Sequence, residues 1–380
     1  MPADASEVQK VLYWPDYLAM ALYMAGLVAI GLYFRRFAQA SLENYFLAGR
    51  RFKGWMTGTS YAVTCMNADV PVVYCGMAAI TGVWICWWYI ARFGPALLIA
   101  GVLFAVFWRR LGLFSSPEFY ELRFSGAPGI TMRTWISLRS AFIAVVAWTG
   151  GGLLGLSKVS HAVLGWDRWE TLWVVIPVIL VYVILSGYVG VVVSDLFQTL
   201  ILIVSSLVLM GLVWQDFGGP AGLCEALVEQ FGSQEAARIV NWHPPASHEF
   251  LGAIGIVGWI LGTAIGYGGD LAPMAGAMEG QRVLSCRNSR EASKMYVWTA
   301  AMLFLMLAVL TLPALAAIVK WPGLYTREIA DQEIAYGMLL KEYLPTGLLG
   351  LSLVALFASI MSTVDSNLNL GAQVFINDVY

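Results

Sequence analysis

The chain of 380 residues is 59% hydrophobic and only 12% charged, with a formal net charge of -2. Soluble domains carry about 25% charged residues, so the composition excludes an ordinary soluble protein, and nothing in it indicates a nucleic-acid partner. The apolar stretches are also too long and too little alternating for an outer-membrane β-barrel. We therefore expect an all-α polytopic membrane protein.

Hydropathy divides the chain into membrane-spanning segments of roughly 20 apolar residues. We predict helices over residues 14–34, 55–79, 82–108, 131–157, 169–187, 190–214, 250–279, 295–320 and 346–375. The short polar stretch before residue 11 lacks the charged region and cleavage site of a signal peptide, so the first segment is expected to be retained as a helix. The loop over residues 215–249 is expected to form a small, partly helical cap.

Lys and Arg side chains predict the orientation in the membrane, because cytoplasmic loops are enriched in them. With the N-terminus outside, the cytoplasmic segments receive the basic clusters at residues 35–53, 109–133 and 282–294. The opposite loops hold fewer basic residues. We therefore expect a multi-pass protein of a plasma or inner membrane with its N-terminus outside.

The second predicted helix contains a break. Pro71 removes a backbone donor and clashes with the preceding turn, and Asn67 and Asp69 place polar groups in the same apolar stretch. Carbonyls freed by such a break are tolerated in a membrane only where they line a cavity. The seventh predicted helix has a similar interruption, rich in Gly and ending in Pro, at residues 266–273.

Two interrupted, acid-bearing helices in corresponding positions are typical of transporters built from inverted repeats. Counting from the first break gives a five-helix repeat over residues 55–214, preceded by an extra N-terminal helix at 14–34. Residues 250–375 then form a partial second repeat within one transporter domain over residues 1–380. Two more helices would complete it, so we expect the chain to lack its C-terminal helices.

The ninth predicted helix carries hydroxyl groups at helical spacing. Ser359, Ser362, Thr363 and Ser366 recur three and four residues apart, which places them on one face. Such a face could offer oxygens to a hard cation or to a neighbouring helix. Small hydroxyls also pack helices closely and bond to carbonyls of their own helix, and this segment alone does not separate the two interpretations.

In their order and spacing, several motifs resemble those of the sodium:solute symporter family, a member of the leucine-transporter fold class. The resemblance covers nearly the whole chain, and its motifs lie at residues 45–50, 186–190, 194–198, 281–284, 361–366 and 375–380. It implies a leucine-transporter-like fold of inverted five-helix repeats, with the second repeat incomplete.

The resemblance also implies a sodium site between the first broken helix and the ninth helix. Carried over by matching motifs, the ligands are the backbone carbonyls of Val63, Met66 and Ser359 and the hydroxyls of Ser362 and Thr363. Na⁺ is a hard cation that prefers oxygen ligands, which agrees with this set.

Two acids are assigned to the sodium path or to coupling. The resemblance places Asp195 on the sodium exit path, with a helix-terminal charge as the alternative. Asp365 adds negative potential near the site or, alternatively, only fixes helix packing as a hydrogen-bonded carboxylate.

A solute site is expected near the two breaks. The candidate residues are Asn67, Asp69, Trp88, Tyr89, Arg92, Tyr267 and Asp270. Arg92 needs an anion inside the membrane, either an internal aspartate or an acidic solute. Aromatic walls with a few amides and acids would also suit a sugar or polyol. The chain departs from sugar carriers at Ala272–Pro273 and from proline carriers at Cys65, so neither substrate is carried over.

Together these features predict sodium-coupled symport of a small organic solute, a sugar, polyol or organic anion, by alternating access. A proton-coupled carrier, with Asp69 or Asp365 titrating, and a sensor domain of a longer signalling protein remain alternatives. An enzyme is disfavoured, because the sequence has no metal-ligand cluster, nucleophile-plus-base pair or phosphate-binding Gly loop. The oligomeric state is left open.

Overall fold

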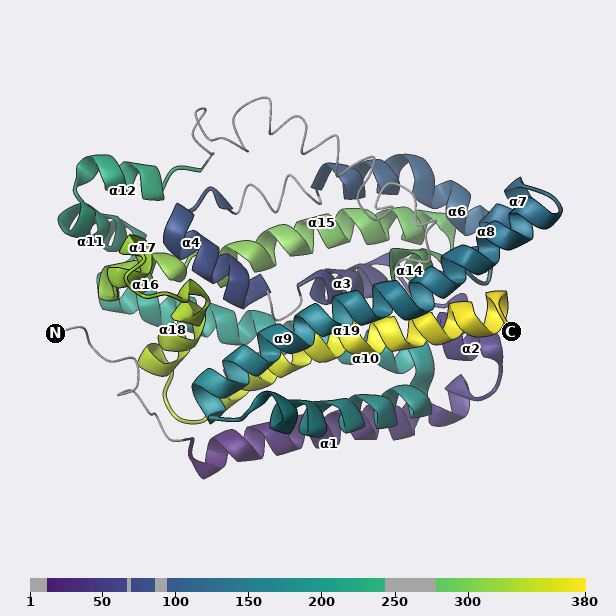
Figure 1. The fold of residues 1–380 in the computed structure, drawn as a ribbon, viewed down its shortest axis with the longest axis horizontal. Helices are drawn as coiled ribbons and strands as arrows, with labels where there is room; N and C mark the ends of the chain where they lie inside the picture. Colours follow the sequence, from purple (N-terminus) through teal and green to yellow (C-terminus); the bar gives the residue numbers. More distant parts are fainter. Residues whose placement is uncertain (1–11, 67–69, 86–93, 243–277) are drawn as a thin grey trace.

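The structure is a computed structural model that describes residues 12–66, 70–85, 94–242 and 278–380. Long helices run along the long axis of the molecule (Figure 1). Among the described residues, the structure has one isolated β-bridge, between Phe52 and Cys286.

The helical elements are α1 (Trp14–Ala38), α2 (Leu42–Leu47), η1 (Ala48–Arg50), α3 (Gly54–Cys65), η2 (Val70–Tyr74), α4 (Cys75–Thr81), η3 (Ala100–Phe104), α6 (Ala105–Leu111), α7 (Glu118–Arg123), α8 (Ala127–Leu138), η4 (Arg139–Ala144), α9 (Val145–Leu164), α10 (Arg168–Phe217), α11 (Pro220–Phe231), α12 (Ser233–Ile239), α14 (Met278–Ser285), α15 (Ser289–Thr311), α16 (Ala314–Lys320), α17 (Gly323–Thr326), η5 (Gln332–Ile334), α18 (Ala335–Tyr343) and α19 (Leu348–Asp378).

Five helical stretches of the described residues are long and apolar enough to cross a membrane: Trp14–Ala38, Gly94–Leu111, Arg168–Phe217, Ser289–Lys320 and Leu348–Asp378. They confirm the membrane class expected from composition. The span predicted over 131–157 is also helical, as α8, η4 and α9. The helix predicted over 250–279 lies outside the described residues, apart from the start of α14.

The helix α10 contains a sharp bend at Gly187, which separates the two spans predicted over 169–187 and 190–214 (Figure 1). Gly187 has φ +53° and ψ −151°, a conformation that side chains disfavour. A Cβ at this position would also lie 2.5 Å from the backbone oxygen of Tyr45 in α2. The bend therefore requires glycine for both its backbone conformation and its close packing.

The break predicted in the second helix is confirmed on its N-terminal side. The helix α3 ends at Cys65, Met66 is non-helical with φ −90° and ψ 55°, and helical structure is described again from Val70. The residues between them lie outside the described part. Two glycines bring α3 against α15: a Cβ on Gly54 would lie 2.2 Å from the backbone oxygen of Glu291, and one on Gly58 would lie 2.7 Å from that of Met295.

The helix α19 crosses the middle of the molecule, with α1 below it and α3 above it in the view of Figure 1. Apolar side chains of α1, α10 and α19, including Tyr23, Tyr182 and Phe357, form one buried cluster. Short helices α11, α12, α16, α17 and α18 gather at one end, and α2, α7 and α14 lie near the other (Figure 1). The helices α11 and α12 confirm the partly helical cap predicted over residues 215–249.

Candidate cation site

The hydroxyl face of α19 meets the end of α3. Ser359 Oγ donates to the backbone oxygen of Met66, and Thr363 Oγ1 donates to that of Thr64 at 3.0 Å. Ser362 Oγ lies 3.0 Å from Thr64 Oγ1. These hydroxyls bond across to the neighbouring helix, which is one of the two roles considered for them. They lie at the point where α3 ends and Met66 leaves the helical conformation.

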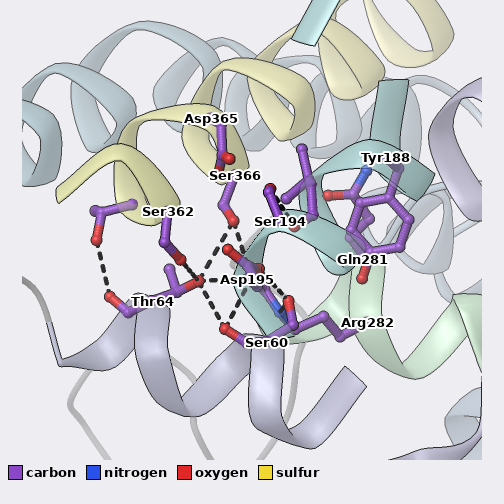
Figure 2. A network of polar contacts seen from close by, with 12 residues as sticks. Ser60, Thr64, Tyr188, Ser194, Asp195, Gln281, Arg282, Ser362, Asp365 and Ser366 are labelled. Atoms are coloured by element: carbon purple, nitrogen blue, oxygen red, sulfur yellow. Dashed lines mark hydrogen bonds and ion pairs between the residues drawn. The ribbon is translucent and has the colours of Figure 1, made fainter. Parts of the chain in front are cut away.

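A guanidinium group lies beside this cluster. Arg282 of α14 is fully buried, and its Nη2 donates to Thr64 Oγ1 at 2.7 Å and to Ser366 Oγ at 2.9 Å (Figure 2). Its Nε donates to Ser60 Oγ at 3.1 Å. Because Ser60 and Thr64 are on α3 and Ser366 is on α19, this one side chain joins three helices.

Asp195 of α10 completes the network from a fourth helix (Figure 2). Its Oδ2 accepts from Ser60 Oγ at 2.5 Å and lies 3.6 Å from Arg282 Nη2. Both charged side chains are completely buried. Asp365, also buried, accepts a hydrogen bond from Tyr182 of α10. Three ionisable groups are therefore buried together inside the helix bundle.

The oxygen atoms gathered here are suitable ligands for a monovalent hard cation. Among the described residues, the buried atoms Asp195 Oδ1 and Asp365 Oδ1 have no hydrogen-bond partner. Arg282 lies beside Asp195 and offsets its charge, so the carboxylate oxygens without partners leave acceptor capacity close to the hydroxyls. Oxygen atoms of this kind are the ligands that a hard cation prefers.

The structure brings together five of the predicted residues. The α19 residues Ser359, Ser362 and Thr363 meet the end of α3 at Thr64 and Met66. Asp195 is linked to this cluster through Ser60, whose Oγ donates to Asp195 and whose backbone oxygen accepts from Thr64 Oγ1. Val63 is buried in the last turn of α3, and Asp365 is buried on α19. The predicted solute residues lie outside the described residues: Asn67, Asp69, Trp88, Tyr89, Arg92, Tyr267 and Asp270.

Sequence reasoning missed the contribution of Arg282, Ser60 and Thr64. Arg282 falls in a basic segment expected on the cytoplasmic side, and only the structure shows that its side chain is completely buried among α3, α10 and α19. Ser60 and Thr64 are four residues apart and share one face of α3, a spacing that could have matched the hydroxyl face of α19. No comparable signal in the sequence pairs Arg282 with Asp195.

Comparison with known proteins agrees with this arrangement. The sodium:solute symporter family matches residues 45–380. The chain belongs to this family, as the motifs predicted. The family and the relatives below are transporters, which agrees with the expectation that the protein is not an enzyme.

Three curated relatives illustrate the similarity. The chain is 22% identical to rat solute carrier family 5 member 4, covering 96% of this chain and 57% of the relative. It is 23% identical to the sodium/mannose cotransporter SLC5A10 of Bos taurus, and the match covers 100% of this chain and 66% of the relative. It is 25% identical to the sodium/glucose cotransporter of Vibrio parahaemolyticus, and the match covers 99% of this chain and 70% of the relative. The chain thus spans little more than half the length of the rat relative.

A solved structure has the same fold. It is the substrate-bound outward-open state of a Na⁺-coupled sialic acid symporter, described as revealing a novel Na⁺-site. The TM-score is 0.79 at 18% sequence identity, and the match covers 97% of this chain and 75% of the other. This likeness confirms the predicted fold class at the level of the overall helical arrangement.

Proposed function

We propose that the protein is a sodium-coupled symporter that imports a small organic solute by alternating access. The observation that carries this proposal is the meeting of the α19 hydroxyls with the end of α3, beside the buried pair of Asp195 and Arg282. Membership of the sodium:solute symporter family supports it. The fold implies Na⁺ as the coupling ion, and the residues present fit that ion.

Na⁺ would be held by the carbonyls of Val63, Met66 and Ser359 and by the hydroxyls of Ser362 and Thr363. The hydrogen bonds from Ser359 Oγ to the Met66 carbonyl and from Thr363 Oγ1 to the Thr64 carbonyl hold α19 against the end of α3, and they involve two of the proposed ligand oxygens, those of Met66 and Thr363. A bound ion would supply positive charge that joins α3 to α19. Because coupling is reciprocal, sodium and solute should tighten each other's binding by the same factor.

The contacts of Arg282 would close the route from this site toward the proposed cytoplasmic side. Ser60, Asp195 and Arg282 are completely buried and bonded to one another, so they leave no wetted path among their own side chains. We propose that release of sodium inward requires Arg282 to separate from α3 and α19. Asp195 would then act as the acid on the exit path.

The solute is proposed to be a sugar, a polyol or an organic anion. Relatives are named for sodium-coupled transport of glucose and mannose, and the structural neighbour for sialic acid. The residues proposed to contact it are those around the two breaks, from Asn67 and Asp69 to Tyr267 and Asp270. Arg92 would favour a solute that carries an acidic group.

The remaining architecture is proposed from the repeat count. The repeats over 55–214 and 250–375 would rock against each other in a plasma or inner membrane, surrounded by lipid, with the N-terminus outside. The helix over residues 14–34 would stand outside both repeats, within a single transporter domain over residues 1–380.

Thermal stabilisation of the purified protein by sodium tests the proposal. We expect NaCl, but not choline or potassium chloride at equal ionic strength, to raise the unfolding temperature. Sodium at 100 times its dissociation constant would stabilise the folded state by about 2.7 kcal/mol. The double variant Ser362→Ala, Thr363→Ala should lose this response, because it removes two proposed ligands.

The matched control removes two hydroxyls that bond within their own helix. Ser205 Oγ donates to the Leu202 carbonyl and Thr171 Oγ1 to that of Asp167, so Ser205→Ala with Thr171→Ala should keep the sodium response. A folded wild-type protein without any sodium response would refute sodium coupling and favour the proton-coupled or sensor alternatives. Solutes that stabilise further only in sodium would identify the substrate class.

A further inference from the structure

The N-terminal helix α1 supplies the cap of α19. Asp16 Oδ1 accepts hydrogen bonds from the backbone N–H groups of Gly347 and Gly350, each at 2.7 Å. Its Oδ2 accepts from the N–H of Tyr13 at 3.1 Å. Asp16 is only 1% exposed, so this is a buried carboxylate whose partners are backbone donors at a helix N-terminus.

Two glycines at the start of α19 leave room for the side chain of Asp16. Its N-cap residue is Gly347, with φ +88°, which has no side chain to cap the helix itself. Gly350 lets α1 approach closely, because a Cβ there would lie 2.4 Å from the Cα of Asp16. The first N–H groups of a helix lack partners within the helix, so the cap in this protein comes from another helix.

Two more contacts link α1 to the middle of the bundle, one to α19 and one to α10. Tyr23 Oη lies 4.0 Å from Met361 Sδ, next to Ser362, and accepts from Gln198 Nε2 of α10 at 2.8 Å. Eight residues further along α1, a Cβ on Gly31 would lie 3.2 Å from the Cα of Tyr182 in α10. Tyr182 is the residue that donates a hydrogen bond to Asp365. The helix α1 therefore touches α19 and its partners at three levels along its length.

We propose that α1 is a positioning element of the sodium site, with Asp16 setting the axial position of α19 and Tyr23 holding it beside Met361. This inference rests on the proposed function, because it assigns α1 a role in that same site. Ser359, Ser362 and Thr363 contact Met66 and Thr64 at the present axial position of α19, and a shift by one residue, about 1.5 Å along the helix, would disturb all of these contacts together. Asp16 fixes that position from the far end of the helix.

The expected effect follows from the population of binding-competent protein. If α19 loses its cap, part of the population holds the hydroxyls out of register, and the apparent dissociation constant rises by the inverse of the competent fraction. Loss of an N-cap is worth roughly a five-fold change in a local equilibrium. Asp16→Ala should therefore raise the sodium concentration for half-saturation by about three-fold to five-fold: three-fold when the competent and incompetent states are equally populated in the wild type, five-fold when the competent state is the minor one.

Equilibrium binding of radioactive sodium to the full chain in detergent, with choline replacing sodium in the blanks, measures this. Asp16→Asn keeps an acceptor oxygen for both N–H groups and should restore half-saturation to within about two-fold of wild type. Tyr23→Phe keeps the ring and removes only the hydroxyl contacts, and should raise half-saturation about two-fold.

Asp167→Ala is the matched control, because Asp167 caps α10 by accepting from Glu170 N at 2.7 Å. It should lower the unfolding temperature in choline without changing sodium half-saturation. If Asp16→Ala and Tyr23→Phe both reach half-saturation at the same sodium concentration as the wild type, the inference is overturned. If Asp16→Ala does not fold, the sodium concentration for half-saturation of Tyr23→Phe decides alone. Wild-type protein that binds no sodium would instead refute the proposed function.

Discussion

Replacing Arg282 with methionine should destabilise the protein by leaving the carboxylate of Asp195 buried without its positive partner. The two side chains are 0% exposed, and their closest N–O distance is 3.6 Å. Arg282 also donates to Thr64 Oγ1 and Ser366 Oγ, so the variant removes the contacts that join α14 to α3 and α19. Solvent cannot replace these contacts, because the surrounding side chains are buried as well.

The magnitude follows from the cost of breaking a buried ion pair, about 3–5 kcal/mol when one partner is removed. At about 2 °C per kcal/mol, this predicts a fall of about 6–10 °C in the unfolding temperature. Asp195→Asn should cost a similar amount, because it leaves Arg282 buried without a counter-charge. The double variant removes both charges, so its loss should be smaller than the sum of the single losses by about 2–3 kcal/mol.

Thermal unfolding in detergent, followed by tryptophan fluorescence in sodium-free choline buffer, measures all four proteins without interference from bound sodium. The pair Arg238 and Glu235 is the matched control, since it lies 3.1 Å apart but the arginine side chain is 67% exposed. The variant Arg238→Gln should change the unfolding temperature by less than about 2 °C. Additive losses for Arg282→Met and Asp195→Asn would show that the two groups do not interact, and would refute the network.

Gly187→Ala should destabilise the protein by more than about 1–3 kcal/mol, since φ +53° with ψ −151° suits only glycine and the added Cβ would meet backbone of α2. Gly211→Ala, with nothing within 4 Å of its Cβ, should be neutral or stabilising in the same unfolding assay, and equal effects of the two would contradict the bend. Arg133→Gln should cost about 2–3 kcal/mol, because Arg133 Nε bonds at 2.7 Å to Asp378, whose side chain is 0% exposed. Arg238→Gln, at an exposed pair, should cost less than about 1 kcal/mol, and a matching loss there would contradict the reasoning from burial.

The sequence alone determined the membrane class, the break after α3 and the hydroxyl face of α19. Each of these depends on local information. Long apolar runs require helices in a bilayer, Pro71 prevents a regular helix around it, and a spacing of three and four places Ser359, Ser362 and Thr363 on one face. The motifs also placed the chain in its family, although the residues predicted to bind solute lie outside the described residues and stay predictions.

The tertiary structure decided which groups meet that hydroxyl face and which charges are buried with it. Arg282 and Asp195 come from helices far apart in the sequence, and periodicity gives the face of a helix but not the helix opposite. A guanidinium can be buried only where other helices supply acceptors, so its position in the sequence cannot reveal its burial. The same holds for Asp16, which caps a helix that begins more than three hundred residues later in the chain.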